Sequence, residues 1–169
     1  EFSPQPGAIA FTQKALPTNY IFGLFDAPAP SHADYPAMVV GMSYLSDRLF
    51  EEVRTKRNLT YSVSSGVTSR RANYGYFYVT ASDPAATIPV MFTEVERMKD
   101  EALCDQAIAE TLNVFLTQYY MGQETNSSQA AQLASAYIVS GDWRAAGQFL
   151  ERVSAVTAAT RRCIASSGS

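Results

Sequence analysis

Histidine and cysteine are the residue types that this chain has least of, apart from a lone tryptophan. The only histidine, His32, falls in a segment expected to be a loop, and the only cysteines are Cys104 and Cys163. Zinc sites need clustered His, Cys, Asp or Glu ligands, and nucleophilic catalysis usually needs a base such as histidine beside the nucleophile. The sequence therefore argues against a zinc site of its own and against Ser-His or Cys-His catalysis. We interpret His32 as a solvated loop residue and both cysteines as free structural thiols, with a disulfide left open.

Long apolar runs, excess positive charge and phosphate-binding loops are also missing. No apolar run approaches the ~18 residues that span a bilayer, and the first residues lack the pattern of a signal peptide. Thirteen basic and sixteen acidic residues give a net charge of −3, which argues against a dedicated nucleic-acid binder but leaves a local basic patch open. No Gly-x-x-x-x-Gly-Lys motif occurs. Glu1 is not a natural start, so we interpret the chain as a fragment or a processed form.

The composition that is present describes one globular domain. The chain has 169 residues, of which 47% are hydrophobic and 17% charged, enough for a sizeable core. Prolines near the start predict a tail or linker over residues 1–8, and the Ser/Gly-rich end predicts a tail over residues 166–169. A single domain is therefore expected at residues 9–165.

Hydrophobic periodicity predicts strands first and helices afterwards. The predicted strands cover residues 20–25, 60–68 and 74–81, with a short edge strand at 9–11, and the strands at 60–68 and 74–81 should form a hairpin. Long helices are predicted from a cap at Asp34 to about Arg57 and over 105–121. Between them, another helix is predicted after the break at Asp83-Pro84, with one face formed by Ile88, Met91, Val95 and Met98. This order predicts an α+β fold with a mainly antiparallel sheet, covered by helices on one face, and a helix-rich C-terminal third.

The last third should hold shorter helices. One is expected to open at Ser127 or Ser128 and to end at Gly141. Another should be capped by Asp142 and have Trp143 on its packed face, and a final one should open at Thr157.

A corner between the first helix and the second strand stands out. Arg54 lies in the last turn of the helix, where cations suit the negative end of the helix dipole, and Asn58 is a plausible left-handed cap. Tyr61 then opens a strand in which alternate residues, Tyr61, Val63, Ser65 and Val67, should share one face. Spacing alone allows an ordinary explanation for both, because arginines favour helix ends and tyrosines favour strands.

An aromatic stripe on the third strand offers a different function. Tyr74, Tyr76 and Tyr78 should share one face, with Phe77 and Val79 on the other. Such a stripe is typical of RNA-recognition motifs, where strand aromatics stack on bases. The acidic pI near 5.1, the missing final strand near residue 110 and the long helical end argue against that function. Packing under a helix or against a partner domain is the alternative for the stripe.

The stretch from Ser46 to Ser65 gives the most specific signal. Ser46-Asp-Arg-Leu-Phe-Glu-Glu-Val-Arg54, followed by Leu59-Thr-Tyr-Ser-Val63, resembles the pitrilysin/insulinase family of zinc metalloproteases, which includes the mitochondrial processing peptidases. The match is to a pattern in the family's second domain, which carries no zinc. The usual glycine-rich run before this pattern is replaced here by Gly41-Met-Ser-Tyr-Leu45, and the chain stops where the family usually adds a closing strand.

The resemblance implies a division of labour between two domains. A companion domain or subunit, fused or separate, would carry the family's His-x-x-Glu-His motif, bind Zn²⁺ and supply the general base. This domain would bind the peptide substrate through Arg54 and Tyr61, with the Tyr61 hydroxyl acting catalytically, in trans, as a hydrogen-bond donor to a substrate carbonyl. Alone, it should bind no metal and hydrolyse no peptide.

Two alternatives remain open beside that function. A catalytically inert assembly subunit of the same family would be expected to have lost the Arg54–Tyr61 pair. An RNA-binding module would bind single-stranded RNA in a salt-sensitive way. We expect no nucleic-acid partner and no membrane insertion, and a bacterial periplasm or cytoplasm is the favoured compartment.

Overall fold

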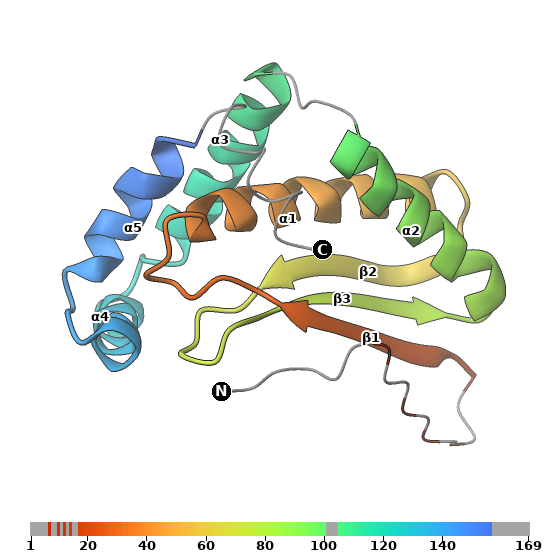
Figure 1. Ribbon diagram of the computed structural model, residues 1–169, viewed down its shortest axis with the longest axis horizontal. Helices are drawn as coiled ribbons and strands as arrows, with labels where there is room; N and C mark the ends of the chain where they lie inside the picture. Colours follow the sequence, from red (N-terminus) through yellow and green to blue (C-terminus); the bar gives the residue numbers. More distant parts are fainter. Residues whose placement is uncertain are drawn as a thin grey trace.

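The computed structural model describes residues 17–100 and 105–156, together with residues 7, 10, 12 and 14. Its sheet has three strands, β1 (Asn19–Asp26), β2 (Thr60–Val67) and β3 (Tyr74–Ala81). Its helices are α1 (Tyr35–Leu49), the π-helix η1 (Phe50–Thr55), α2 (Pro84–Asp100), α3 (Asp105–Met121), α4 (Asn126–Ser140) and α5 (Ala145–Ser154) (Figure 1). The predicted α+β class and the helix-rich C-terminal third are both confirmed.

The three described strands form an antiparallel sheet in the order β1-β3-β2. β1 pairs with β3 from Asn19 opposite Ala81 to Asp26 opposite Tyr74, and β2 pairs with β3 as the predicted hairpin. β2 carries one extra residue, because Thr60 faces Ala81 whereas Val63 faces Val79. This irregularity makes the predicted alternation wrong at its first member: Thr60 is buried, and Tyr61 is 81% exposed.

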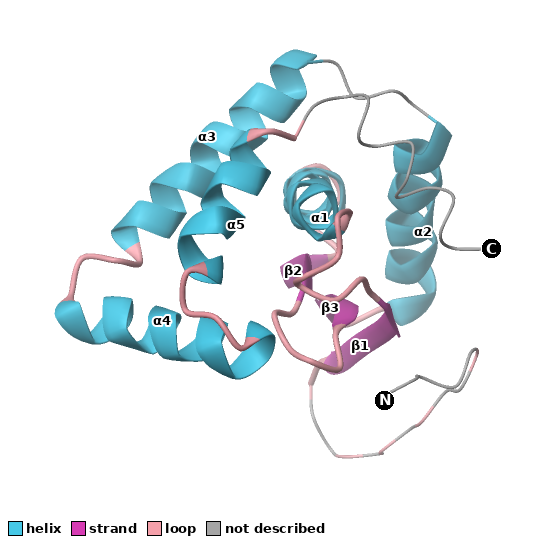
Figure 2. Ribbon diagram, turned by 60° about the vertical axis from the view of Figure 1, so that its left-hand side comes forward, coloured by secondary structure: helices cyan, strands magenta, loops and turns pink. Residues whose placement is uncertain are grey.

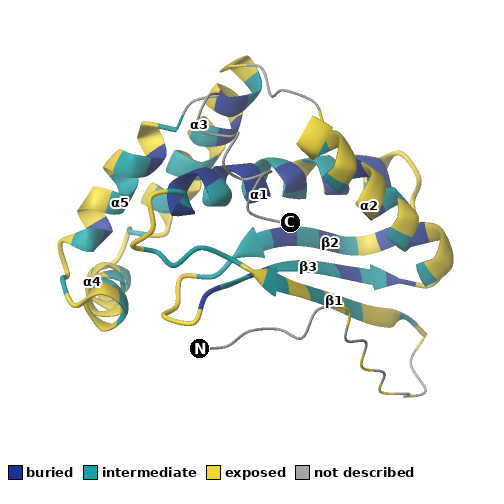
Figure 3. Cartoon of the chain, viewed as in Figure 1, coloured by how far each residue is buried: buried dark blue, intermediate teal, exposed yellow. Residues whose placement is uncertain are grey.

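The core lies between one face of the sheet and the helices α1 and α2, which cover that face. It consists of Met42, Leu45, Leu49, Val53, Val63, Val79 and Met91. Figure 2 shows α1 end-on above β2, with α2 on one side of it and α3 and α5 on the other. Figure 3 colours the chain by burial and shows buried residues along α1 and on β2 and β3, which it covers. The core therefore holds α1, and the corner that follows it, firmly against β2 and β3.

The opposite face of the sheet is aromatic, with no helix lying over it among the described residues. Phe22 of β1 is 55% exposed, and its ring stacks on Tyr76 of β3 at a centroid distance of 5.5 Å. The predicted division of β3 is confirmed, because Val79 is in the core and Phe77 packs against it from the same face. The alternative in which the tyrosines pack under a helix is not what the described residues show.

The predicted start of α1 is confirmed, whereas that of α4 is wrong. Pro36 lies in the first turn of α1 as expected, but the Asp34 side chain makes no capping hydrogen bond. Thr125, and neither Ser127 nor Ser128, caps α4, whereas the predicted end at Gly141 is confirmed by its φ of +81°.

The last described helix, α5, begins at Ala145, three residues beyond the predicted cap. The Asp142 carboxylate accepts a hydrogen bond from the backbone N–H of Arg144 just before the helix, at 2.9 Å. Trp143 is 50% exposed, so its predicted place on the packed face is wrong. Arg152 of α5 donates to the backbone oxygens of Pro30 and His32, which ties this helix to the loop before α1.

Several predictions fall outside the described residues: the edge strand at 9–11, the helix from Thr157, the tail boundaries, and both cysteines, Cys104 and Cys163. Among the helices that are described, none is long and apolar enough to cross a membrane.

Candidate functional site

A π-helical turn delivers Arg54 to the corner. The backbone N–H of Lys56 donates to the oxygen of Glu51 at 2.9 Å, a spacing of five residues. The helix predicted to about Arg57 continues to Thr55, but from Phe50 onward it is a π-helix. Asn58 then takes a φ of +51°, which confirms the predicted left-handed cap. The chain enters β2 two residues later. Wide turns of this kind are often found at functional sites.

A buried carboxylate anchors this turn from below. Glu52 is 6% exposed, and its carboxylate accepts hydrogen bonds from Lys56 at 2.6 Å and from Arg57 at 2.5 Å. These two hydrogen bonds, first that from Lys56 and then that from Arg57, lower the pKa of Glu52 from 4.5 to about 2. Glu52 therefore lies inside the corner and is not a solvated residue of the helix surface. The two cations near the helix end therefore serve the structure of the corner.

The low pKa of Glu52 predicts how the stability of the domain depends on pH. A carboxyl whose pKa is lower in the folded state stabilises the fold above its unfolded pKa, and this contribution is lost as the pH falls towards the folded pKa. The free energy of unfolding, measured by urea denaturation between pH 6 and pH 2.5, should fall below about pH 4.5. Glu52→Gln should be less stable at pH 6 and should fall less steeply. An equal slope in both proteins would contradict this assignment.

Arg54 and Tyr61 meet at the surface of the corner. The centre of the Arg54 guanidinium lies 5.1 Å from the centroid of the Tyr61 ring and 4.8 Å from that of Phe50. In the described part of the chain, Arg54 has no ion pair and the Tyr61 hydroxyl has no hydrogen bond. The structure thus brings both sequence-predicted residues together, with their donor groups available.

The neighbouring cations are all paired, in contrast to Arg54. Arg48 donates twice to the buried carboxylate of Glu94 on α2, at 2.7 and 3.1 Å, and these hydrogen bonds raise the pKa of Arg48. Lys56 lies 3.0 Å from Glu51 in addition to its contact with Glu52. Arg48, although it belongs to the same sequence pattern as Arg54, therefore joins α1 to α2.

Sequence reasoning missed the contact of Phe50 with Arg54 and the irregularity in β2. Phe50 precedes Arg54 by four residues, the spacing at which side chains meet on a helix, so this signal could have been read. The extra residue between Thr60 and Val63 could not be read from the sequence, because larger and small polar residues alternate without interruption through this stretch.

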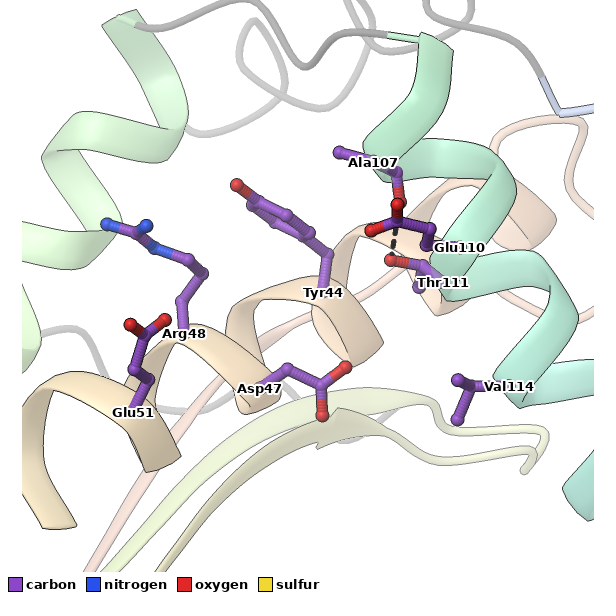
Figure 4. Close-up of a pocket in the computed structure, with 8 residues that line it drawn as sticks. All are labelled: Tyr44, Asp47, Arg48, Glu51, Ala107, Glu110, Thr111 and Val114. Atoms are coloured by element: carbon purple, nitrogen blue, oxygen red, sulfur yellow. Dashed lines mark hydrogen bonds between the residues drawn. The ribbon is translucent and has the colours of Figure 1, made fainter. Parts of the chain in front are cut away.

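A cavity of about 300 Å³ lies between α1 and α3 (Figure 4), and its lining includes neither Arg54 nor Tyr61. Its charged lining comes mainly from the carboxyls of Asp47, Glu51 and Glu110, and from Arg48. Burial raises the pKa of Asp47. Residues 17–100 and 105–156 contain no group of three or more His, Cys, Asp and Glu placed to hold a metal ion, so a zinc ion does not fit this part of the chain.

Comparison with known proteins identifies the family. Residues 3–115 match the model of the peptidase M16 inactive domain. The chain belongs to this family. An uncharacterized zinc protease of Streptomyces coelicolor is 28% identical over 125 residues, which are 72% of this chain and 27% of that protein. The chain thus spans about a quarter of the length of this curated relative.

Solved structures confirm the M16 inactive-domain fold beyond residue 115. The inactive peptidase domain of a zinc protease from Bordetella parapertussis is similar with a TM-score of 0.78 at 16% identity, over 92% of this chain and 87% of that one. A chain of complex III2 from Candida albicans also gives 0.78, at 13% identity, over 92% of this chain and 41% of that one. The resemblance to the non-zinc domain of the pitrilysin/insulinase family is therefore confirmed.

Proposed function

We propose that this M16 inactive domain completes, in trans, the active site of a zinc-bearing companion domain or subunit, and binds the peptide substrate there through Arg54 and Tyr61. The observation that carries the proposal is the Arg54 guanidinium, which has no ion pair among the described residues, beside the ring of the exposed Tyr61. Family membership supports it, and so does the S. coelicolor zinc protease, which is much longer than this chain.

The two side chains suit different parts of this task. Negative charge develops on the carbonyl oxygen of the scissile peptide bond during hydrolysis, and the Tyr61 hydroxyl can donate a hydrogen bond to that oxygen. The Arg54 guanidinium has five N–H donors, so it can hold a neighbouring peptide carbonyl while its carbon lies over the Tyr61 ring. In zinc peptidases the metal ion supplies the activated water, and here that ion belongs to the companion.

Reconstitution tests the proposal. Four samples are compared with an internally quenched peptide: this chain, the companion carrying the His-x-x-Glu-His motif, their mixture, and a mixture with Arg54→Gln. Only the unmodified mixture should cleave the peptide at the full rate, and zinc analysis should find the metal with the companion. Full activity of the companion alone would contradict the proposal.

A structural role in a larger assembly is the second candidate function, because the similar chain of complex III2 belongs to such an assembly. This alternative predicts that the mixture forms a stable complex without proteolytic activity. The Arg54–Tyr61 pair favours the protease, because a purely structural subunit would not need hydrogen-bond donors that have no partner among the described residues of this corner.

A further inference from the structure

Packing in the hydrophobic core does not account for the position of the Phe50 side chain. Phe50 is the first residue of η1 and is 44% exposed, whereas Leu49 before it and Val53 after it have no exposed surface. The ring takes no part in the hydrophobic core. The guanidinium carbon of Arg54 lies over this ring, 4.8 Å from its centroid.

The contact with the Phe50 ring can hold the Arg54 guanidinium without occupying its N–H groups. A guanidinium within about 6 Å of an aromatic ring is attracted by the electrons of the ring face. Contact through the face of the guanidinium leaves its N–H groups, which point outward in its plane, available for another acceptor. A carboxylate partner would instead occupy these N–H groups, and Arg54 has none among the described residues.

Two rings together limit the positions that Arg54 can take. Phe50 contacts it from the same helix, four residues earlier, and Tyr61 contacts it from the start of β2. Holding a long, flexible side chain in its binding position before the substrate arrives reduces the entropy lost on binding. The buried anchor at Glu52 keeps the backbone of this turn in place beneath both rings.

We propose that Phe50 is a positioning residue of the substrate-binding corner, which, together with the Tyr61 ring, holds the Arg54 guanidinium ready to bind a peptide carbonyl. This inference rests on the proposed function of Arg54 and Tyr61. Phe50 itself touches neither the substrate nor the reacting atoms in this account. It acts only through Arg54, and this makes the inference separable from the proposed function.

A double-mutant cycle in the assembled protease tests the inference, with an internally quenched peptide as the probe. Phe50→Leu should lower kcat/KM by about two- to fivefold, mainly by raising KM, as expected for the loss of one exposed cation–π contact. Phe50→Tyr, which keeps an aromatic ring, should retain the activity. Phe50→Leu should have no further effect when Arg54 is already Gln. In this chain, Phe50→Leu should also shift the Arg54 Nε–H resonance in the NMR spectrum and leave the thermal midpoint nearly unchanged.

The outcomes separate the two levels of the account. Wild-type kinetics for Phe50→Leu beside impaired Arg54→Gln would overturn the positioning role and leave the proposed function standing. An equal loss from Phe50→Leu in both backgrounds would show that Phe50 does not act through Arg54, and would also overturn it. Wild-type activity of both Arg54→Gln and Tyr61→Phe would overturn the proposed function itself.

Discussion

Replacing Tyr61 by Phe should lower kcat of the assembled protease by about 10²–10³, the usual loss when one donor to a developing oxyanion is removed. The substitution deletes only the hydroxyl, so the ring remains against Arg54. Because Tyr61 is 81% exposed and its hydroxyl has no partner in the described part of the chain, the free energy of unfolding should change by less than about 0.5 kcal/mol. Steady-state kinetics and urea denaturation of the same preparation measure both quantities.

Tyr137→Phe is the matched control for this substitution. Tyr137 lies on α4, is 60% exposed and likewise loses only a hydroxyl. It should retain wild-type kcat. If Tyr61→Phe also retained wild-type kcat, the catalytic role assigned to Tyr61 would be wrong.

Replacing Leu49 by Ala should destabilise the domain by about 3 kcal/mol, within the ~2–5 kcal/mol found for large-to-small changes in protein cores. Leu49 is fully buried among Met42, Leu45 and Val53 on α1 and η1 and the strand residues beneath them. The deletion leaves a cavity directly before the turn that delivers Arg54. The measurement is the free energy of unfolding from urea denaturation.

Leu133→Ala provides the comparison for Leu49→Ala. The α4 helix has no buried residue, and Leu133 is 41% exposed, so its loss should cost less than about 1 kcal/mol. Equal destabilisation by the two substitutions would contradict the placement of the core between α1 and the sheet.

Local sequence signals predicted the parts of the fold that depend on neighbouring residues. The hairpin strands, the helix over 105–121 and the positive φ of Asn58 each follow from the spacing or chemistry of a few adjacent positions. The aromatic and apolar faces of β3 follow from simple alternation. These features need no knowledge of what packs against them.

The features that sequence reasoning missed depend on how the chain packs in three dimensions. The extra residue in β2 is visible only in the pairing of this strand with β3. The Glu52 carboxylate is paired with Lys56 and Arg57, which fold back across a wide turn. Trp143 was placed on a packed face, but α5 begins only after it. Periodicity cannot indicate which helix face another element will cover.

The two residues of the candidate site could be predicted from the sequence, but their surroundings could not. The resemblance selected Arg54 and Tyr61, and the structure brings them into contact. Only the structure shows that Arg48 pairs with Glu94 and that Tyr61 turns outward at the irregular start of β2. The contact of Phe50 with Arg54 was also missed, although their spacing of four residues could have indicated it. The functional roles of Arg54 and Tyr61 stay predictions until the assembled protein is measured.

Photocrosslinking from position 61 tests the central claim most directly. Tyr61 is replaced by p-benzoylphenylalanine, and the chain is assembled with a companion whose catalytic glutamate is changed to glutamine, so that the bound peptide stays intact. Irradiation followed by mass spectrometry should find the crosslink on the peptide residues that flank the scissile bond. Crosslinks to the companion alone, with the peptide bound but unlabelled, would show that Tyr61 does not face the substrate and would contradict the account.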